Sequence, residues 1–143
     1  IGAADVDLWA FELGEPEPIV EAWKTLLSER EKRRAERFVF DPDRNRWIVA
    51  RGVLRHLLAR YCDIAPAAIE FQYAPAGKPS IAKPGSGTAP VTFNLAHSHD
   101  RALLGVALNR AIGVDLELAR DDFDPLPIAR QFFFGTELTA IEA

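Results

Sequence analysis

The chain has 143 residues, 48% of them hydrophobic, and a formal net charge of -4 at pH 7. A chain of this size can build one core, or one core and part of a second. The single Cys62 excludes an intramolecular disulfide, no signal-like segment opens the chain, and no apolar run approaches the roughly 20 residues that span a bilayer. We therefore expect a cytoplasmic protein outside the membrane.

Charge is distributed unevenly along the chain. Ten of the 17 basic residues lie between Ser28 and Arg60, whereas acidic residues dominate from Gly113 onward. This separation suits a site that holds phosphates on one side and a cation on the other, although solvated helix faces explain most such arginines equally well. A basic helix that binds nucleic acid is not favoured, because the net charge is negative and the arginine face lacks interleaved aromatic residues.

The first half of the chain predicts one strand followed by three helices. Apolar and charged residues alternate over 5–13, a helical stripe covers 19–27, and Ser28 with Glu31 forms a capping box that begins a second helix. A wide apolar face over 43–61 marks the principal core helix. Arg55 on its edge is interpreted as a helix-surface charge, and Arg51 either as the same or as a ligand-binding residue.

The second half predicts strands and then a helical pattern. Residues 69–73 and 93–98 have strand patterns, and the apolar runs 101–108 and 112–118, joined through Asn109-Arg110, predict a β-hairpin. A helical pattern begins at Pro127. We expect an α+β fold in which 5–13, 69–73 and the hairpin at 101–118 form an antiparallel sheet packed against the long helix.

Two carboxylates on the last of these strands indicate a metal site. Asp115 and Glu117 lie two residues apart, share one strand face and are roughly 7 Å apart along the chain, so both can bind one hard cation such as Mg²⁺. The neighbouring strand would bring His97 close to them. Solvated surface charge is the simpler alternative. A metal-dependent hydrolase that uses His97 and His99 with Asp115 and Glu117 is another, although it lacks a third histidine ligand.

Three motifs in order resemble those of one enzyme family. Asn94-Leu95-Ala96-His97-Ser98 and Gly113-Val114-Asp115-Leu116-Glu117 are similar to a motif pair of the 4′-phosphopantetheinyl transferases of the surfactin-synthetase-activating (Sfp) type. Gly77-Lys78-Pro79 matches the G-K-P motif of that family. Ala96 departs from the pattern, because the family usually has Ser or Thr there.

The resemblance implies an enzyme that transfers the 4′-phosphopantetheine arm of coenzyme A to a serine of an acyl or peptidyl carrier protein. It implies that Asp115 and Glu117 hold Mg²⁺ on the pyrophosphate and that His97 acts with them in catalysis. It also implies that coenzyme A is bound by seven residues: Arg34, Arg51, Lys78, Pro79, Ala96, His97 and Ser98.

The same resemblance implies a fold of two pseudo-symmetric halves. Residues 1–110 would form the N-terminal half and 111–143 the truncated beginning of the second half. The W-x-x-K-E motif that supplies the family's third acidic ligand is absent from these residues, and so is any Met. We therefore expect a piece that binds metal weakly or not at all and is inactive alone. Its bare apolar face, including some of Phe132, Phe133, Phe134 and Leu138, would be covered by a second copy or by a bound second fragment.

Overall fold

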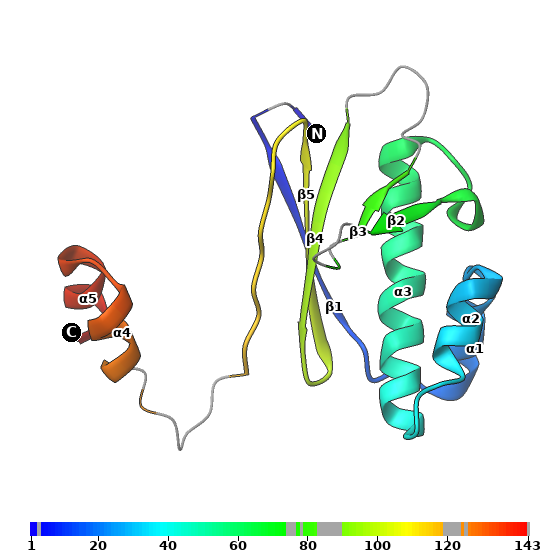
Figure 1. Cartoon of the computed structure of the whole chain (residues 1–143), viewed down its shortest axis with the longest axis horizontal. Coiled ribbons are helices and arrows are strands. Elements are labelled where there is room, and N and C mark those ends of the chain that lie inside the picture. The colour runs from blue at the N-terminus through cyan, green and yellow to red at the C-terminus, as the bar shows by residue number, and fades with distance from the viewer. Residues whose placement is uncertain are drawn as a thin grey trace.

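Figure 1 shows the computed structural model of the chain, which describes residues 1–2, 4–73, 77, 79–82, 90–118, 124 and 126–142. The expected α+β architecture is confirmed, with an antiparallel sheet packed on one long helix. The elements follow in the order β1 (Val6–Glu12), α1 (Glu17–Lys24), α2 (Glu29–Ala35), α3 (Asp41–Cys62), η1 (Pro66–Ala68), β2 (Phe71–Tyr73), β3 (Pro79–Ile81), β4 (Val91–Ser98), β5 (Arg101–Leu108), α4 (Leu126–Phe132) and α5 (Gly135–Glu142). No helix in these described ranges is long and apolar enough to cross a membrane.

The main sheet has the strand order β1-β5-β4, and all pairs are antiparallel. Its hairpin joins β4 to β5 through His99 and Asp100, and His99 has a φ of 51° in that turn. The predicted hairpin at 101–118 is therefore wrong. Because β1 and β4 occupy both edges of β5, residues 111–118 cannot pair with β5, and they run in extended form along the sheet face opposite α3 instead (Figure 1).

The predicted strand at 69–73 exists in shorter form but does not join this sheet. β2 pairs with β3 in a separate two-stranded sheet, in which Tyr73 lies opposite Pro79. The two strands are separated by only a few residues, so their pairing closes a short loop at low entropic cost. The strand pattern predicts an extended segment but does not encode its pairing partner, and the assignment to the main sheet was wrong.

One face of the main sheet packs on α3 and forms the core. Phe93, Leu104 and Val106 of the sheet meet Leu54 and Leu58 of α3, and all five are buried. A second buried cluster joins α1 to the other side of α3. Gly52 permits this close approach, since a Cβ there would lie 2.7 Å from the Cβ of Trp23.

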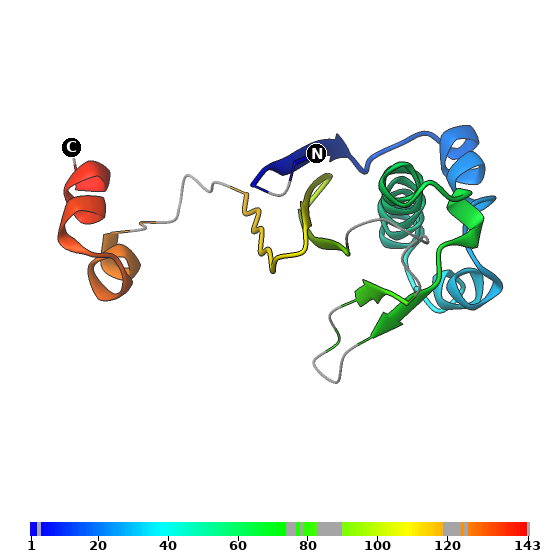
Figure 2. The same cartoon turned by 90° about the horizontal axis from the view of Figure 1, so that it is seen from above.

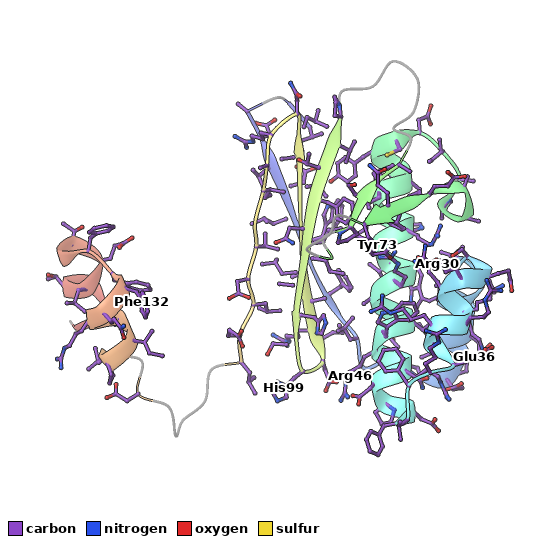
Figure 3. All side chains as sticks on the ribbon, in the orientation of Figure 1. Arg30, Glu36, Arg46, Tyr73, His99 and Phe132 are labelled. Atoms are coloured by element: carbon purple, nitrogen blue, oxygen red, sulfur yellow. The ribbon has the colours of Figure 1, made fainter. Side chains whose placement is uncertain are left out.

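The last two helices, α4 and α5, lie apart from the sheet and α3 in both views of the chain (Figure 1, Figure 2). Phe132, Phe133 and Phe134 are 67%, 49% and 82% exposed, and Figure 3 shows Phe132 on this helix pair, away from the other labelled residues. The predicted bare apolar face is thus confirmed for these three rings, whereas Leu138 is half-buried. Its cover by a second copy or fragment stays a prediction, which light scattering with intact-mass analysis would check.

Candidate functional site

A groove of about 650 Å³ opens between α3 and β4, with side chains from α2 and β3 at its rim. Four of the seven residues predicted to bind coenzyme A line it together, and these are Arg34, Arg51, Pro79 and His97. They come from four elements or their ends, so only tertiary packing places them together. Lys78, the fifth predicted residue, lies outside the described residues, although Gly77 and Pro79 on either side of it are described.

The remaining two predicted residues, Ala96 and Ser98, do not line the groove. Side chains alternate between the two faces of a strand. On β4, Phe93, Leu95 and His97 lie on the α3 side and line the groove, and Asn94 also borders it. Ala96 and Ser98 lie on the opposite face. There the Ser98 hydroxyl accepts a hydrogen bond from the Leu118 amide at 3.2 Å.

The groove also contains residues that the sequence did not single out, among them Arg46 and Trp47 of α3, and Phe38. His99, which the sequence offered only as a metal ligand, lines the groove from the β4–β5 turn. Figure 3 shows Arg46 and His99 at the same end of the molecule. Asp43, Trp47, Ala50, Arg51 and Leu54 share one stripe of α3 at helical spacing. The sequence does contain this pattern: a tryptophan and an arginine on one stripe of a helix could have identified the side of α3 that lines the groove.

Arg46 and Arg34 both line the groove, but only Arg46 is paired with carboxylates of the described residues. Arg46 donates to Asp100 at 2.6 Å and to Asp43 at 3.2 Å, and the hydrogen bond with Asp100 raises the pKa of Arg46. The guanidinium of Arg34 stacks 5.6 Å from the ring centroid of Trp47. It forms no ion pair with a carboxylate in the described part of the chain, so its charge is available to an anion in the groove.

Arg51 is held in place by a buried ion cluster that it forms with Glu31 and Arg55. It donates to the Glu31 carboxylate and to the Tyr73 hydroxyl, and its guanidinium stacks 4.0 Å from the Phe71 ring centroid. Arg55 donates to Glu31 at 2.8 Å and to the backbone oxygens of Pro66 and Ile69 at 2.9 Å each. The interpretation of Arg55 as a helix-surface charge was wrong: its position on α3 faces the α2 capping box and not solvent.

Glu31 stays ionised within this cluster. Burial alone would raise the pKa of its carboxyl, but the Ser28 backbone amide and the Arg51 and Arg55 guanidinium groups outweigh that effect and lower it. The predicted capping box is confirmed, because the Ser28 amide donates to Glu31 at 2.8 Å and the Glu31 amide donates to the Ser28 hydroxyl. One carboxylate therefore caps α2 and joins it to α3.

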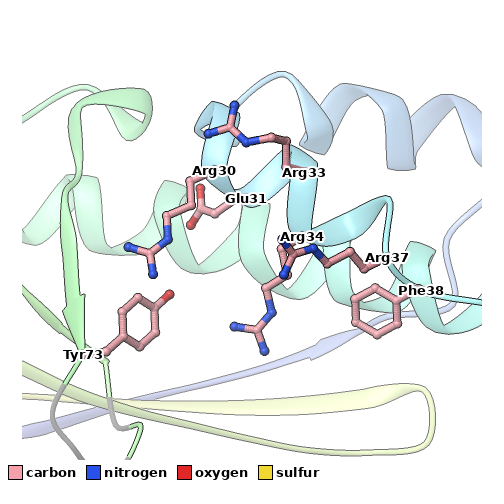
Figure 4. A pocket seen from close by; sticks show the side chains of 7 residues that line it. All are labelled: Arg30, Glu31, Arg33, Arg34, Arg37, Phe38 and Tyr73. Atoms are coloured by element: carbon pink, nitrogen blue, oxygen red, sulfur yellow. The ribbon is translucent and has the colours of Figure 1, made fainter.

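A second hollow of about 600 Å³ adjoins the groove and shares Arg34 and Phe38 with it. Figure 4 shows the four arginines that border it from α2 and the residues after it, namely Arg30, Arg33, Arg34 and Arg37. All four are exposed, and none forms an ion pair within the described residues. The adjoining hollow is thus strongly cationic.

The two carboxylates predicted to bind a metal lie on the other side of the sheet. Figure 1 shows the extended segment 110–118 beside the sheet face opposite α3. The predicted alternation holds without a strand: Ile112, Val114 and Leu116 are half-buried, whereas Asp115 and Glu117 are exposed. His97 faces the groove instead, so the expectation that β4 brings it close to these carboxylates is not met.

The chemistry of Asp115 and Glu117 suits Mg²⁺, since both offer exposed carboxylate oxygens on one side of an extended segment. The described residues contain no group of three or more His, Cys, Asp or Glu side chains that could hold a metal. Two carboxylates leave most of the coordination sphere to water and to substrate oxygens. The hydrolase alternative gains no support, because His97 and His99 do not join these carboxylates in such a group.

Comparisons with known proteins identify the family of this chain. The family model of the N-terminal part of 4′-phosphopantetheinyl transferases matches residues 15–109. The chain is 36% identical over 133 residues to the 4′-phosphopantetheinyl transferase HetI of Nostoc sp., covering 93% of this chain and 56% of that protein. It is 33% identical over 114 residues to the human L-aminoadipate-semialdehyde dehydrogenase-phosphopantetheinyl transferase, covering 76% of this chain and 36% of that protein. It thus spans about half of the first relative and about a third of the second.

A solved structure shares the fold. Holo-(acyl-carrier-protein) synthase from Bacillus anthracis, in complex with CoA (3′,5′-ADP), superposes with a TM-score of 0.55 at 18% sequence identity, covering 72% of this chain and 93% of that chain. This likeness supports the architecture, and the family model supports the assignment. The chain belongs to the 4′-phosphopantetheinyl transferase family.

Proposed function

We propose that this chain supplies the coenzyme-binding part of an enzyme that transfers the 4′-phosphopantetheine arm of coenzyme A to a serine of an acyl or peptidyl carrier protein. The observation that carries the proposal is the single groove that gathers Arg34, Arg51, Pro79 and His97. The enzyme names of the family relatives support the same activity. We also propose that residues 111–143 begin the second half of the enzyme.

The groove has the chemistry that coenzyme A requires. Guanidinium groups form charge-assisted, often bidentate hydrogen bonds with phosphate. The Arg34 guanidinium stacks on Trp47 and forms no ion pair within the described residues. Arg51 also lines the groove, with its guanidinium stacked on Phe71 and hydrogen-bonded to Glu31 and Tyr73. Phe38 and Trp47, whose ring centroids are 6.0 Å apart, offer an aromatic surface for a nucleobase.

In the proposed reaction, the serine oxygen of the carrier protein forms a bond to the phosphorus that bears the pantetheine arm. The bond from that phosphorus to the bridging pyrophosphate oxygen breaks, adenosine 3′,5′-bisphosphate leaves and the serine proton is released. Positioning and neutralisation of negative charge account for most of the rate in such transfers. Arg34, Arg51 and His97 would hold the phosphates on the groove side.

Asp115 and Glu117 would hold Mg²⁺ from their exposed face. Bound there, the ion would supply positive charge to pyrophosphate oxygens. The carboxylates and the groove lie on opposite faces of the sheet, so coenzyme A would have to pass around the edge strand β4 to reach both. Both carboxylates reach solvent without a basic partner in the described residues, so they remain available to a cation. The chain's own contribution is to orient these two oxygen donors on one segment, which is extended and packed against the sheet.

The cationic hollow beside the groove would receive the carrier protein. Arg30, Arg33 and Arg37 are exposed there, and Val39 and Phe40, which follow in sequence, are 85% and 68% exposed. Arginine and aromatic residues are enriched in protein interfaces. A partner that presents carboxylates would thus dock next to the groove, where its serine must reach coenzyme A.

We infer a cytoplasmic location from the free Cys62.

Intact-mass spectrometry of a carrier protein tests the proposal directly. The full-length protein that contains these residues is incubated with coenzyme A, Mg²⁺ and the carrier protein. We expect the carrier protein to gain the mass of phosphopantetheine, and we expect no gain in a carrier variant whose acceptor serine is alanine. Absence of the gain with several acyl and peptidyl carrier proteins would refute the transferase assignment.

A further inference from the structure

The extended segment 110–118 is fastened to the sheet by polar side chains of β4. The Asn94 side-chain oxygen accepts a hydrogen bond from the Val114 amide at 2.8 Å, and the Ser98 hydroxyl accepts one from the Leu118 amide at 3.2 Å. Thr92 donates its hydroxyl to the backbone oxygen of Arg110. All three side chains lie on one face of β4, because they are an even number of residues apart.

The two acceptors match the segment in spacing. Asn94 and Ser98 lie four residues apart on β4, and their amide donors, Val114 and Leu118, lie four residues apart on the segment. Both chains are extended and therefore rise by similar amounts per residue. The two hydrogen bonds bracket Asp115 and Glu117, and they fix the backbone immediately before and after this pair.

Packing beneath the segment sets which way the carboxylates face. A Cβ on Gly105 of β5 would lie 2.7 Å from Val114 and 2.8 Å from Ile112, so only glycine leaves room for these side chains on the sheet. The Arg110 guanidinium anchors the start of the segment through the backbone oxygens of Ala4 and Asp5, each at 2.9 Å. With the apolar side chains turned to the sheet, Asp115 and Glu117 must face outward.

Ala96 interrupts this row of acceptors. It lies between Asn94 and Ser98 on the same face of β4, at the level of Leu116, and has no polar side-chain atom. The Leu116 amide instead donates to the side chain of its own neighbour, Asp115, at 2.9 Å. One carboxylate oxygen of Asp115 is thereby engaged with the backbone.

We propose that Asn94 and Ser98 are positioning residues that hold Asp115 and Glu117 in place for a divalent cation, and that Ala96 leaves Asp115 partly engaged with its own backbone. The cation is taken from the proposed function, whereas the hydrogen bonds are independent of it. Asn94 and Ser98 act through the carboxylates and do not themselves touch the metal. A hydroxyl at position 96 would accept from the Leu116 amide and release the Asp115 oxygen.

The test uses the full-length protein and two readouts, amide hydrogen exchange over 110–118 and Mn²⁺ affinity by electron paramagnetic resonance. Ser98→Ala and Asn94→Ala should raise exchange in this segment and weaken Mn²⁺ binding about two- to tenfold, as loss of a single hydrogen bond would. Asn94→Asp retains an acceptor oxygen and should keep the wild-type exchange. Ala96→Ser should strengthen Mn²⁺ binding about two- to tenfold.

Ser80→Ala is the matched control, because Ser80 is exposed on β3 in the other sheet. It should change neither readout. Coenzyme A binding without metal should also be unchanged in Ser98→Ala, since Ser98 does not line the groove. Thermal unfolding of each variant identifies any general loss of folding.

Two results would overturn the proposal. The first is amide exchange over 110–118 that stays at the wild-type rate in Ser98→Ala and Asn94→Ala. The second is faster exchange in these two variants while the Mn²⁺ affinity stays unchanged in both of them and in Ala96→Ser. Neither readout depends on turnover. A wild-type protein that binds Mn²⁺ as described but does not modify a carrier protein would refute the proposed function while leaving the positioning role standing.

Discussion

The Arg55 guanidinium lies 2.7 Å from the Glu31 carboxylate, and only 2% of the Arg55 side chain is exposed. The pair joins the capping box of α2 to the middle of α3. Glu31 is also bound by Arg51, so one buried carboxylate faces two guanidinium groups. This cluster fixes the helix that presents Arg34 and the helix that presents Arg51 to the same groove.

Arg55→Ala should destabilise the fold strongly. Removing one partner of a buried ion pair leaves the other charge uncompensated and typically costs about 3–5 kcal/mol. Chemical denaturation of the 143-residue chain would measure the loss. Arg44→Ala is the matched control, because Arg44 lies on the same helix in a more exposed pair with Asp41 and should cost less than about 1 kcal/mol. Equal losses in the two variants would contradict a central role for the cluster.

Stability should fall in acid as Glu31 becomes protonated. The folded state lowers the pKa of Glu31 below the ordinary value of 4.5. A lowered carboxyl pKa contributes stability that is fully present above pH 4.5, declines as the pH falls below that value and is gone below the folded pKa. Urea unfolding between pH 6 and pH 3 should show this decline, and Glu31→Gln should flatten it. An equally steep decline in Glu31→Gln would assign it to other carboxyls.

Arg34→Gln should weaken the binding of coenzyme A. The substitution removes a guanidinium that lines both hollows and has no carboxylate partner in the described residues. A charge-assisted hydrogen bond to phosphate contributes about 1.5–3 kcal/mol, so the Kd should rise roughly tenfold or more. Calorimetric titration measures it, with Arg44→Gln as the control. A normal Kd in Arg34→Gln would remove this residue from the coenzyme site.

Asp115→Ala should reduce turnover by the full-length protein far more than Arg44→Ala does. Asp115 is exposed, so its loss should leave the unfolding free energy almost unchanged, within about 0.5 kcal/mol. Glu117→Ala should behave similarly, and excess Mg²⁺ should restore part of the activity in both. Steady-state kinetics over a range of Mg²⁺ concentrations would measure this. Turnover that stays normal in both variants would show that the carboxylates are only solvated surface charge.

Charge reversal on α2 should affect the carrier protein and not coenzyme A. Arg33→Glu inverts one exposed charge of the cationic hollow, and Arg33 does not line the groove. We expect KM for the carrier protein to rise and KM for coenzyme A to stay unchanged, with the effect shrinking at high salt. Lys24→Glu, on the neighbouring helix α1, is the control for a general change of net charge. Equal effects of the two substitutions would exclude a specific docking surface.

The sequence determined the strand over β1, the three helices α1 to α3 and the capping box at Ser28, because these depend on local periodicity and on contacts three or four residues apart. Its ordered motifs identified the family, and it named four residues that the groove brings together. It also predicted the alternation in 112–118 that turns Asp115 and Glu117 outward.

Only the tertiary structure decided which strands pair and which charges are buried. Periodicity shows that 112–118 has two faces, but it does not show that β1 and β4 occupy both edges of β5 and so exclude this segment from pairing with β5. Arg55 resembles any other arginine on a helix until Glu31 is placed against it by the packing of α2. His97 and Ser98 are adjacent in one motif, yet strand alternation places one in the groove and the other against Leu118. Contacts between residues far apart in sequence decide each of these outcomes, and a local pattern carries no information about such partners.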